Sequence, residues 1–130
     1  MTLEHVAIWT NNLEALKTYY IKYFHAKSND KYTNDKNNFQ SYFLSFQSGA
    51  RLEIMSMPDV PPNRNDTIEK QHQGIIHLAF GVDTIEEVET KAKELQNDGY
   101  AILRGPRKTG DGYYESVVLD PEGNYLEISA

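Results

Sequence analysis

Two short stretches of the sequence decide the fold: LEHVAI, from Leu3 to Ile8, and IIHLAF, from Ile75 to Phe80. Both have the apolar content of a buried strand, yet both carry a histidine at the third position. Side chains alternate between the two faces of a strand, so each histidine points away from its aliphatic neighbours. The shared pattern of the two stretches, one in each half of the chain, predicts a repeated structural unit.

The first half continues as one helix and a set of strands. Asn11–Asn12 is a plausible helix cap, and apolar residues from Leu13 to Phe24 recur at helical spacing. The polar run 28–38 has turn composition around one short strand. SYFLSF and RLEIMSM then read as a hairpin, which gives the order β-α-β-β-β.

The second half repeats this order. Thr84 to Glu87 has capping-box spacing before a helix that is expected to stop near Gly99. Three strands follow, YAILR, YESVVL and NYLEIS, and a proline-glycine turn at 120–123 joins the last two. We therefore predict an α+β fold in a single domain, 1–130, with module 1 at about 1–57, a proline-rich linker at about 58–73 and module 2 at about 74–130.

Composition excludes several function classes. The 130 residues include no cysteine, which rules out disulfides, thiolate metal sites and a cysteine nucleophile. A formal net charge of -6 without a dense basic cluster argues against nucleic acid as a partner. No apolar run is long enough to cross a membrane, so we expect a soluble, cytoplasmic protein that does not bind membranes.

Parity places four polar side chains opposite the aliphatic faces: His5, Glu53, His77 and Glu127. Each half supplies one histidine and one glutamate in equivalent strands, separated by nearly the same interval. Two imidazoles and two carboxylates suit a divalent metal, whose charge the two carboxylates balance. The alternative is that each is an ordinary solvated residue of a sheet face.

The sequence resembles the vicinal oxygen chelate superfamily, which includes glyoxalase I, bleomycin-resistance proteins and dioxygenases. The residues that carry the resemblance are EHVAI, RLEIMSMP, GIIHLAF and VLDPEGNYLEI, in that order. It implies two βαβββ modules that form an open eight-stranded cup around one divalent ion: Ni, Zn, Co, Mn or Fe. The His, Glu, His, Glu order is similar to that of glyoxalase I and implies that His5, Glu53, His77 and Glu127 are the ligands.

The resemblance further implies a lyase of the glyoxalase I (lactoylglutathione lyase) type, acting in methylglyoxal detoxification. Such an enzyme moves a proton next to a carbonyl, as in the hemithioacetal of a thiol and a 2-oxoaldehyde. Glu127 is the expected catalytic base, and Glu53 is the second choice. Two alternatives remain, a non-enzymatic binder of antibiotic-type small molecules and a CoA-thioester epimerase. The first strand ends AIWTNNL, without the arginine that often binds glutathione, so the thiol stays open.

The predicted partners are a small-molecule substrate, such as a thiol adduct, and a second copy of the chain. A homodimer is expected because exposed strand edges are commonly covered by pairing. The residues expected to contact substrate are Trp9, Met55 and Met57 near the metal ligands, and Arg104, Arg107 and Tyr114 in or beside a glycine-rich loop.

Overall fold

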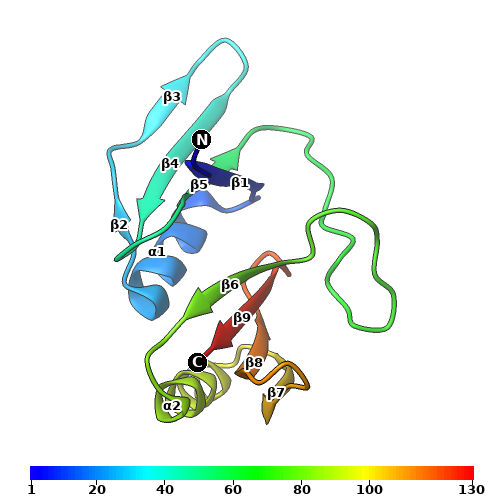
Figure 1. Ribbon diagram of the computed structural model, residues 1–130. Coiled ribbons are helices and arrows are strands. Elements are labelled where there is room, and N and C mark those ends of the chain that lie inside the picture. The colour runs from blue at the N-terminus through cyan, green and yellow to red at the C-terminus, as the bar shows by residue number, and fades with distance from the viewer. The chain divides into compact units, whose positions relative to one another are not determined.

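The computed structural model describes all of residues 1–130. The chain forms two compact units, Met1–Pro62 and Asn63–Ala130, which we call the first and the second unit and describe separately. Each unit contains one helix and one open sheet of mixed parallel and antiparallel strands (Figure 1). The predicted α+β class with two βαβββ-like modules is confirmed.

The first unit has a five-stranded sheet in the order β1-β5-β4-β2, with β3 also paired to β4. β1 and β5 are parallel and the other pairs are antiparallel. Two short strands replace the single one predicted in the polar run, because that run touches β4 at two separate places. The elements are β1 (His5–Trp9), α1 (Leu13–Phe24), β2 (Lys27–Ser28), β3 (Tyr32–Asn34), β4 (Phe39–Ser45) and β5 (Arg51–Ser56).

The second unit has a four-stranded sheet in the order β6-β9-β8-β7, again with one parallel pair, β6 with β9. β7 is longer than predicted and takes in part of the expected glycine-rich loop. Two register shifts interrupt its pairing with β8. The elements are β6 (His77–Gly81), α2 (Ile85–Asn97), β7 (Ile102–Lys108), β8 (Tyr114–Leu119) and β9 (Tyr125–Ser129).

Both helices begin where the sequence predicts. The side chain of Asn12 accepts a hydrogen bond from the backbone N–H of Ala15, 3.1 Å away. Thr84 and Glu87 form a complete capping box at the start of α2. These caps satisfy N–H groups that the first turn of a helix leaves unpaired. Neither helix is long and apolar enough to span a membrane.

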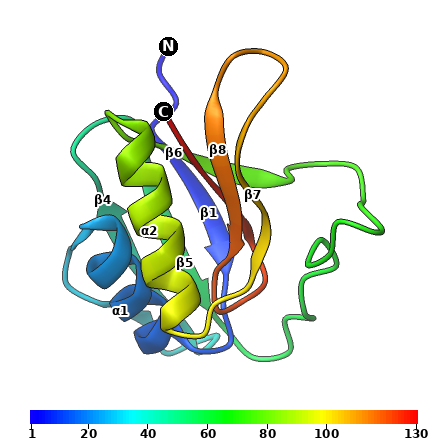
Figure 2. The same ribbon diagram turned by 90° about the horizontal axis from the view of Figure 1, so that it is seen from below.

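Each helix covers the aliphatic face of its own sheet. In the first unit α1 packs on β4 and β5, whose buried residues include Leu44, Leu52 and Ile54. In the second unit α2 packs on β7, β8 and β9 (Figure 2). Val118 and Leu126 are buried there. The opposite face of each sheet is left to the polar residues that alternate with these aliphatic ones.

A buried aspartate fixes the turn between β8 and β9. Asp120 is only 4% exposed, and its carboxylate accepts hydrogen bonds from the backbone N–H groups of Glu122 and Asn124 and from the Asn124 amide, each at 2.9 Å. Gly123 takes a positive φ of 77° in this turn, which glycine adopts without strain. The pairing of β8 with β9 therefore starts from a rigid point.

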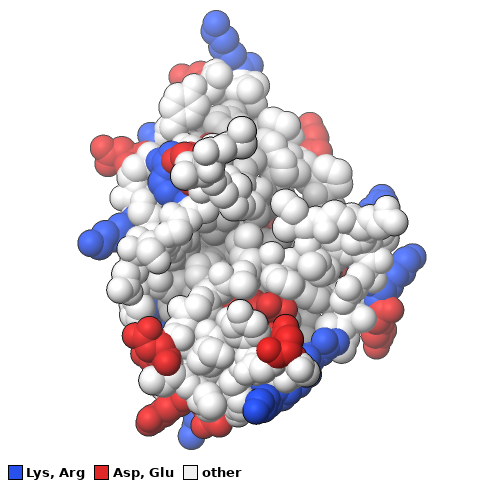
Figure 3. Space-filling view, in the orientation of Figure 1, with Lys and Arg blue, Asp and Glu red and all other residues white.

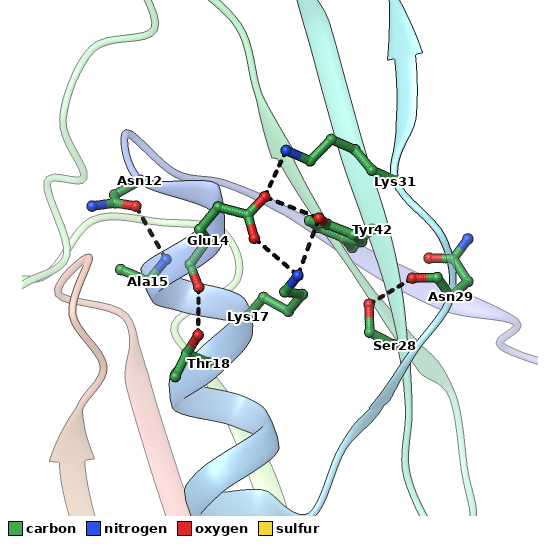
Figure 4. Close-up of polar contacts among 9 residues, drawn as sticks. All are labelled: Asn12, Glu14, Ala15, Lys17, Thr18, Ser28, Asn29, Lys31 and Tyr42. Carbon is green, nitrogen blue, oxygen red and sulfur yellow. Dashed lines mark hydrogen bonds and ion pairs between the residues drawn. The ribbon is translucent and has the colours of Figure 1, made fainter.

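A polar cluster ties the start of α1 to the sheet of the first unit (Figure 4). The Glu14 carboxylate accepts hydrogen bonds from Lys31 at 2.6 Å, Lys17 at 2.9 Å and the Tyr42 hydroxyl at 2.9 Å. Lys17 also lies over the Tyr42 ring, 4.1 Å from its centre. Hydrogen bonds from Lys31, Lys17 and Tyr42 lower the pKa of Glu14 from 4.5 to about 2.

Replacing Glu14 by Gln is expected to destabilise the protein modestly at neutral pH and to flatten its response to acid. The lowered pKa means that the ionised carboxylate adds stability that is complete above about pH 4.5 and is lost as the pH falls towards 2. Because the side chain is half exposed, we expect at most about 1 kcal/mol. Urea unfolding at several pH values measures it, and Glu86→Gln, in the first turn of α2, is the matched control. A constant difference down to pH 2 would contradict the expectation.

Candidate metal centre

The open face of the first sheet carries one histidine and one glutamate side by side. The register pairs His5 with Arg51 and Ala7 with Glu53, so His5 and Glu53 are diagonal neighbours on β1 and β5. Their Nε2 and Oε2 atoms are 3.8 Å apart. Glu53 is 15% exposed and His5 is 39% exposed, so solvent reaches both. We call this pair half-site 1.

The second sheet repeats the arrangement. His77 pairs in register with Tyr125 and Ala79 with Glu127, which makes His77 and Glu127 diagonal neighbours on β6 and β9. Here Nε2 and Oε2 are 3.2 Å apart, and the side chains are 38% and 24% exposed. We call this pair half-site 2. The parity argument from the sequence correctly predicted which residues share each open face.

An alanine stands directly beside the glutamate in each half-site, Ala7 next to Glu53 and Ala79 next to Glu127. A side chain of one carbon leaves room between the strands for the histidine to lean towards the carboxylate. A larger residue at either position would occupy the space between the two polar groups. The alanine in each half-site therefore leaves space for the histidine and the glutamate to approach each other.

The donor atoms of each half-site suit a divalent cation. Two ligands bonded to one tetrahedral ion at about 2.0–2.2 Å lie roughly 3.3–3.6 Å apart, between the 3.2 Å of half-site 2 and the 3.8 Å of half-site 1. Imidazole nitrogen and carboxylate oxygen are the ligand types of Zn, Ni, Co, Mn and Fe sites. No group of three or more histidine and acidic side chains is arranged to hold a metal by itself, so each half-site is counted as two donors.

Half-site 1 has a second layer of polar contacts that half-site 2 lacks. The Nδ1 atom of His5 contacts the Glu4 carboxylate, which also accepts a hydrogen bond from Arg51 Nε at 2.6 Å. Hydrogen bonds from His5 and then Arg51 lower the pKa of Glu4. The matching position before His77 is Ile76, which has no polar side chain. Neither Glu4 nor Arg51 is among the site residues predicted from the sequence.

An aromatic strip lies beside half-site 1. Trp9 pairs in register with Met55, and its ring meets Phe39 edge-on with 6.1 Å between centres. Phe39 in turn contacts Tyr32 at the same separation. Trp9, Tyr32 and Met57 are each more than a third exposed. Of this strip the sequence analysis named Trp9, Met55 and Met57 but missed the two rings from β3 and β4.

The other predicted substrate contacts separate into two groups. Arg104 pairs in register with Val117, and Val117 pairs in register with Glu127. Arg104 therefore lies two strands away from Glu127, at the same level of the sheet as half-site 2. Arg107 forms an ion pair with Glu115 at 3.1 Å, and both arginines belong to β7 instead of a loop. Tyr114 donates to Glu89 of α2 at 2.9 Å, an interaction that raises the Tyr114 pKa. Its hydroxyl is therefore directed to the helix and not to half-site 2.

Charged side chains are dispersed on the face drawn in Figure 3. Lysine and arginine side chains stand in small groups separated by uncharged or acidic residues. A continuous basic surface, on which binding to a phosphate backbone depends, is not seen on that face.

The two units thus share one arrangement, a helix, an open sheet, and a histidine beside a glutamate on the open sheet face. A model of the Glyoxalase/Bleomycin resistance protein/Dioxygenase superfamily matches residues 2–128, and the chain belongs to that superfamily. The search among curated proteins found no match.

Solved structures agree on the fold. The chain is similar to a glyoxalase family protein from Enterococcus faecalis, with 26% identity, a TM-score of 0.77 and coverage of 98% of this chain and 95% of that one. It is also similar to the trypanothione-dependent glyoxalase I of Leishmania major, with 20% identity, a TM-score of 0.74 and coverage of 98% and 85%. Glyoxalase I from Zea mays matches with 21% identity and a TM-score of 0.78, over 98% of this chain and 43% of that one.

Proposed function

We propose that this protein is a metal-dependent lyase of the glyoxalase I type. The observation that carries the proposal is the pair of equivalent half-sites, each with an imidazole Nε2 facing a carboxylate oxygen on an open sheet face. One half-site supplies two donors, and two half-sites together would supply four, enough to hold one divalent ion. His5, Glu53, His77 and Glu127 would hold the ion.

The proposed reaction moves one proton between neighbouring carbons, as in the hemithioacetal of a thiol and a 2-oxoaldehyde such as methylglyoxal. Glu127 takes the proton from the carbon that bears the sulfur and the hydroxyl and delivers it to the adjacent carbonyl carbon, while the hydroxyl proton moves to the former carbonyl oxygen. The product is the isomeric 2-hydroxy thioester, so no further reactant is needed. When bound, a divalent ion supplies Lewis-acid stabilisation of negative charge on substrate oxygen, worth several kcal/mol. Glu53 is the alternative base.

A complete site requires two half-sites to meet, and they come either from one chain or from two copies related by a two-fold axis. We propose a homodimer, because β1 and β6 are edge strands of their sheets and unpaired edges are commonly covered by association. Light scattering at micromolar concentration tests this, and a monomer would exclude the shared arrangement.

The metal content of the purified protein tests the proposed function directly. We expect about one divalent ion per two half-sites and its loss in the double variant His5→Ala/His77→Ala, because two neutral nitrogen donors are removed. Elemental analysis of protein prepared without chelator measures it. His72→Ala is the control, since the side chain of His72 is exposed and only its backbone N–H is bonded, to Asn65 at 2.7 Å.

The outcomes separate cleanly if circular dichroism shows that all three proteins are folded. Equal metal content in the double variant and the wild type would remove the histidines from the site and end the proposal. If the metal depends on the histidines, a screen of metal-loaded protein against hemithioacetals of several thiols identifies the substrate. Turnover should disappear in chelator and return when the ion is restored.

The aromatic strip supports a second candidate, a binder of small aromatic or cationic molecules that performs no reaction. Trp9, Phe39 and Tyr32 present ring surfaces of the kind that bind such ligands. This function predicts quenching of Trp9 fluorescence by ligand that is unaffected by chelator. Quenching that requires the metal would instead favour the enzyme.

A further inference from the structure

Three side chains surround His5, the first histidine of the proposed site: Glu4, Arg51 and Phe43. Arg51 lies over the ring of Phe43, with Cζ 4.2 Å from the ring centre, and the His5 ring meets the same ring edge-on at 5.2 Å. Glu4 links the two side chains, since its carboxylate contacts both Arg51 and His5 Nδ1. One phenylalanine thus supports both partners of Glu4.

The backbone fixes Glu4 as well. The N–H of Arg51 donates to the carbonyl oxygen of Glu4 at 2.9 Å, which extends the β1–β5 ladder by one residue beyond His5. The two carboxylate oxygens are divided, Oε1 towards Arg51 and Oε2 towards His5. Although Glu4 is exposed, its backbone and both oxygens have fixed partners.

A carboxylate can only accept hydrogen bonds, so a neutral His5 must carry its proton on Nδ1. The lone pair then lies on Nε2, the nitrogen that faces Glu53 at 3.8 Å. A histidine whose second nitrogen donates to a carboxylate is oriented for metal binding and is a stronger ligand. In half-site 2 the position before the histidine is Ile76, whose side chain cannot accept a hydrogen bond.

We propose that Glu4 is a positioning residue that selects the Nδ1–H tautomer of His5 and aims its Nε2 at the metal, with Arg51 and Phe43 holding Glu4 in place. The proposal rests on the proposed function, because it presumes that His5 is a ligand. It makes the two half-sites unequal: the first is pre-organised by its neighbours, and the second is not.

Two variants test the role of Glu4. Glu4→Gln keeps the shape but can also donate to Nδ1, and Glu4→Ala removes the contact. Loss of such outer partners typically weakens metal binding about 10- to 100-fold. We expect this loss by calorimetric titration of the metal-free protein with Zn²⁺, larger for Glu4→Ala than for Glu4→Gln. Asp35→Asn, an exposed carboxylate at the tip of the β3–β4 hairpin, is the matched control.

Nitrogen NMR of the metal-free protein gives a readout that does not depend on metal or turnover. Wild-type His5 should show the Nδ1–H tautomer, and both Glu4 variants should shift it towards the mixture of free histidine. Unchanged tautomer and Zn²⁺ affinity in Glu4→Ala would overturn the positioning role. If His5→Ala also left Zn²⁺ affinity unchanged, the proposed function would fail instead, so the two failures are distinguishable.

Discussion

Glu127→Gln is expected to keep its metal and to lose hemithioacetal turnover by roughly 10²- to 10⁴-fold, the usual contribution of a general base. Glutamine retains a carbonyl oxygen that can bind a cation, but an amide cannot accept the substrate proton at neutral pH. Glu127 is 24% exposed on the open face of its sheet, so its carboxylate is accessible to a small molecule. Steady-state kinetics and elemental analysis of the same preparation measure the two effects.

The comparison with Glu53→Gln identifies the base, because the two glutamates occupy equivalent positions in their half-sites. If Glu127 is the base, its variant should lose far more turnover than the Glu53 variant at equal metal content. The reverse order would assign the role to Glu53. Full activity in metal-loaded Glu127→Gln would exclude Glu127 from the reaction, and Glu69→Gln, on an exposed segment, controls for the change in charge.

Leu126→Ala is expected to destabilise the protein by about 2–5 kcal/mol. Leu126 is fully buried beneath α2 and immediately precedes Glu127. The substitution removes apolar contacts and leaves a cavity in the core of the second unit. Thermal unfolding should show a fall in Tm on the order of 10 °C, since one kcal/mol shifts the Tm of a domain of this size by a few degrees.

Leu3→Ala provides the matched control for this effect. Leu3 is 72% exposed, so the same chemical change should alter stability by no more than about 0.5 kcal/mol. A similar loss in both variants would mean that burial of Leu126 beneath the helix contributes little. Such a result would contradict the packing of the second sheet described above.

Local sequence signals were sufficient for the starts of both helices and for the composition of each half-site. The caps at Asn12 and Thr84 follow from hydrogen-bonding chemistry within three residues, and strand alternation alone places His77 and Glu127 on one face. Both signals are short in range. They require no knowledge of which strands become neighbours.

Other features depended on contacts between distant segments and were not predictable in that way. Arg107 looks like part of a loop because glycines surround it, yet pairing with β8 makes it part of a strand. Tyr114 turns towards Glu89, 25 residues away in the chain. The contact between Arg51 and Glu4 spans 47 residues, and only the parallel pairing of β1 with β5 brings them together.

The turn at Asp120 bears on which face of this sheet carries the proposed base, Glu127. A slip of one residue between β8 and β9 would leave most of the backbone hydrogen bonds possible but would send every side chain of β9 to the opposite face. Glu127 would then be buried against α2, and Leu126 would take its place in the open. The three hydrogen bonds to the Asp120 carboxylate fix where the pairing begins. The hydrogen bonds of the turn thereby favour the register that keeps the proposed base, and not an apolar side chain, on the open face.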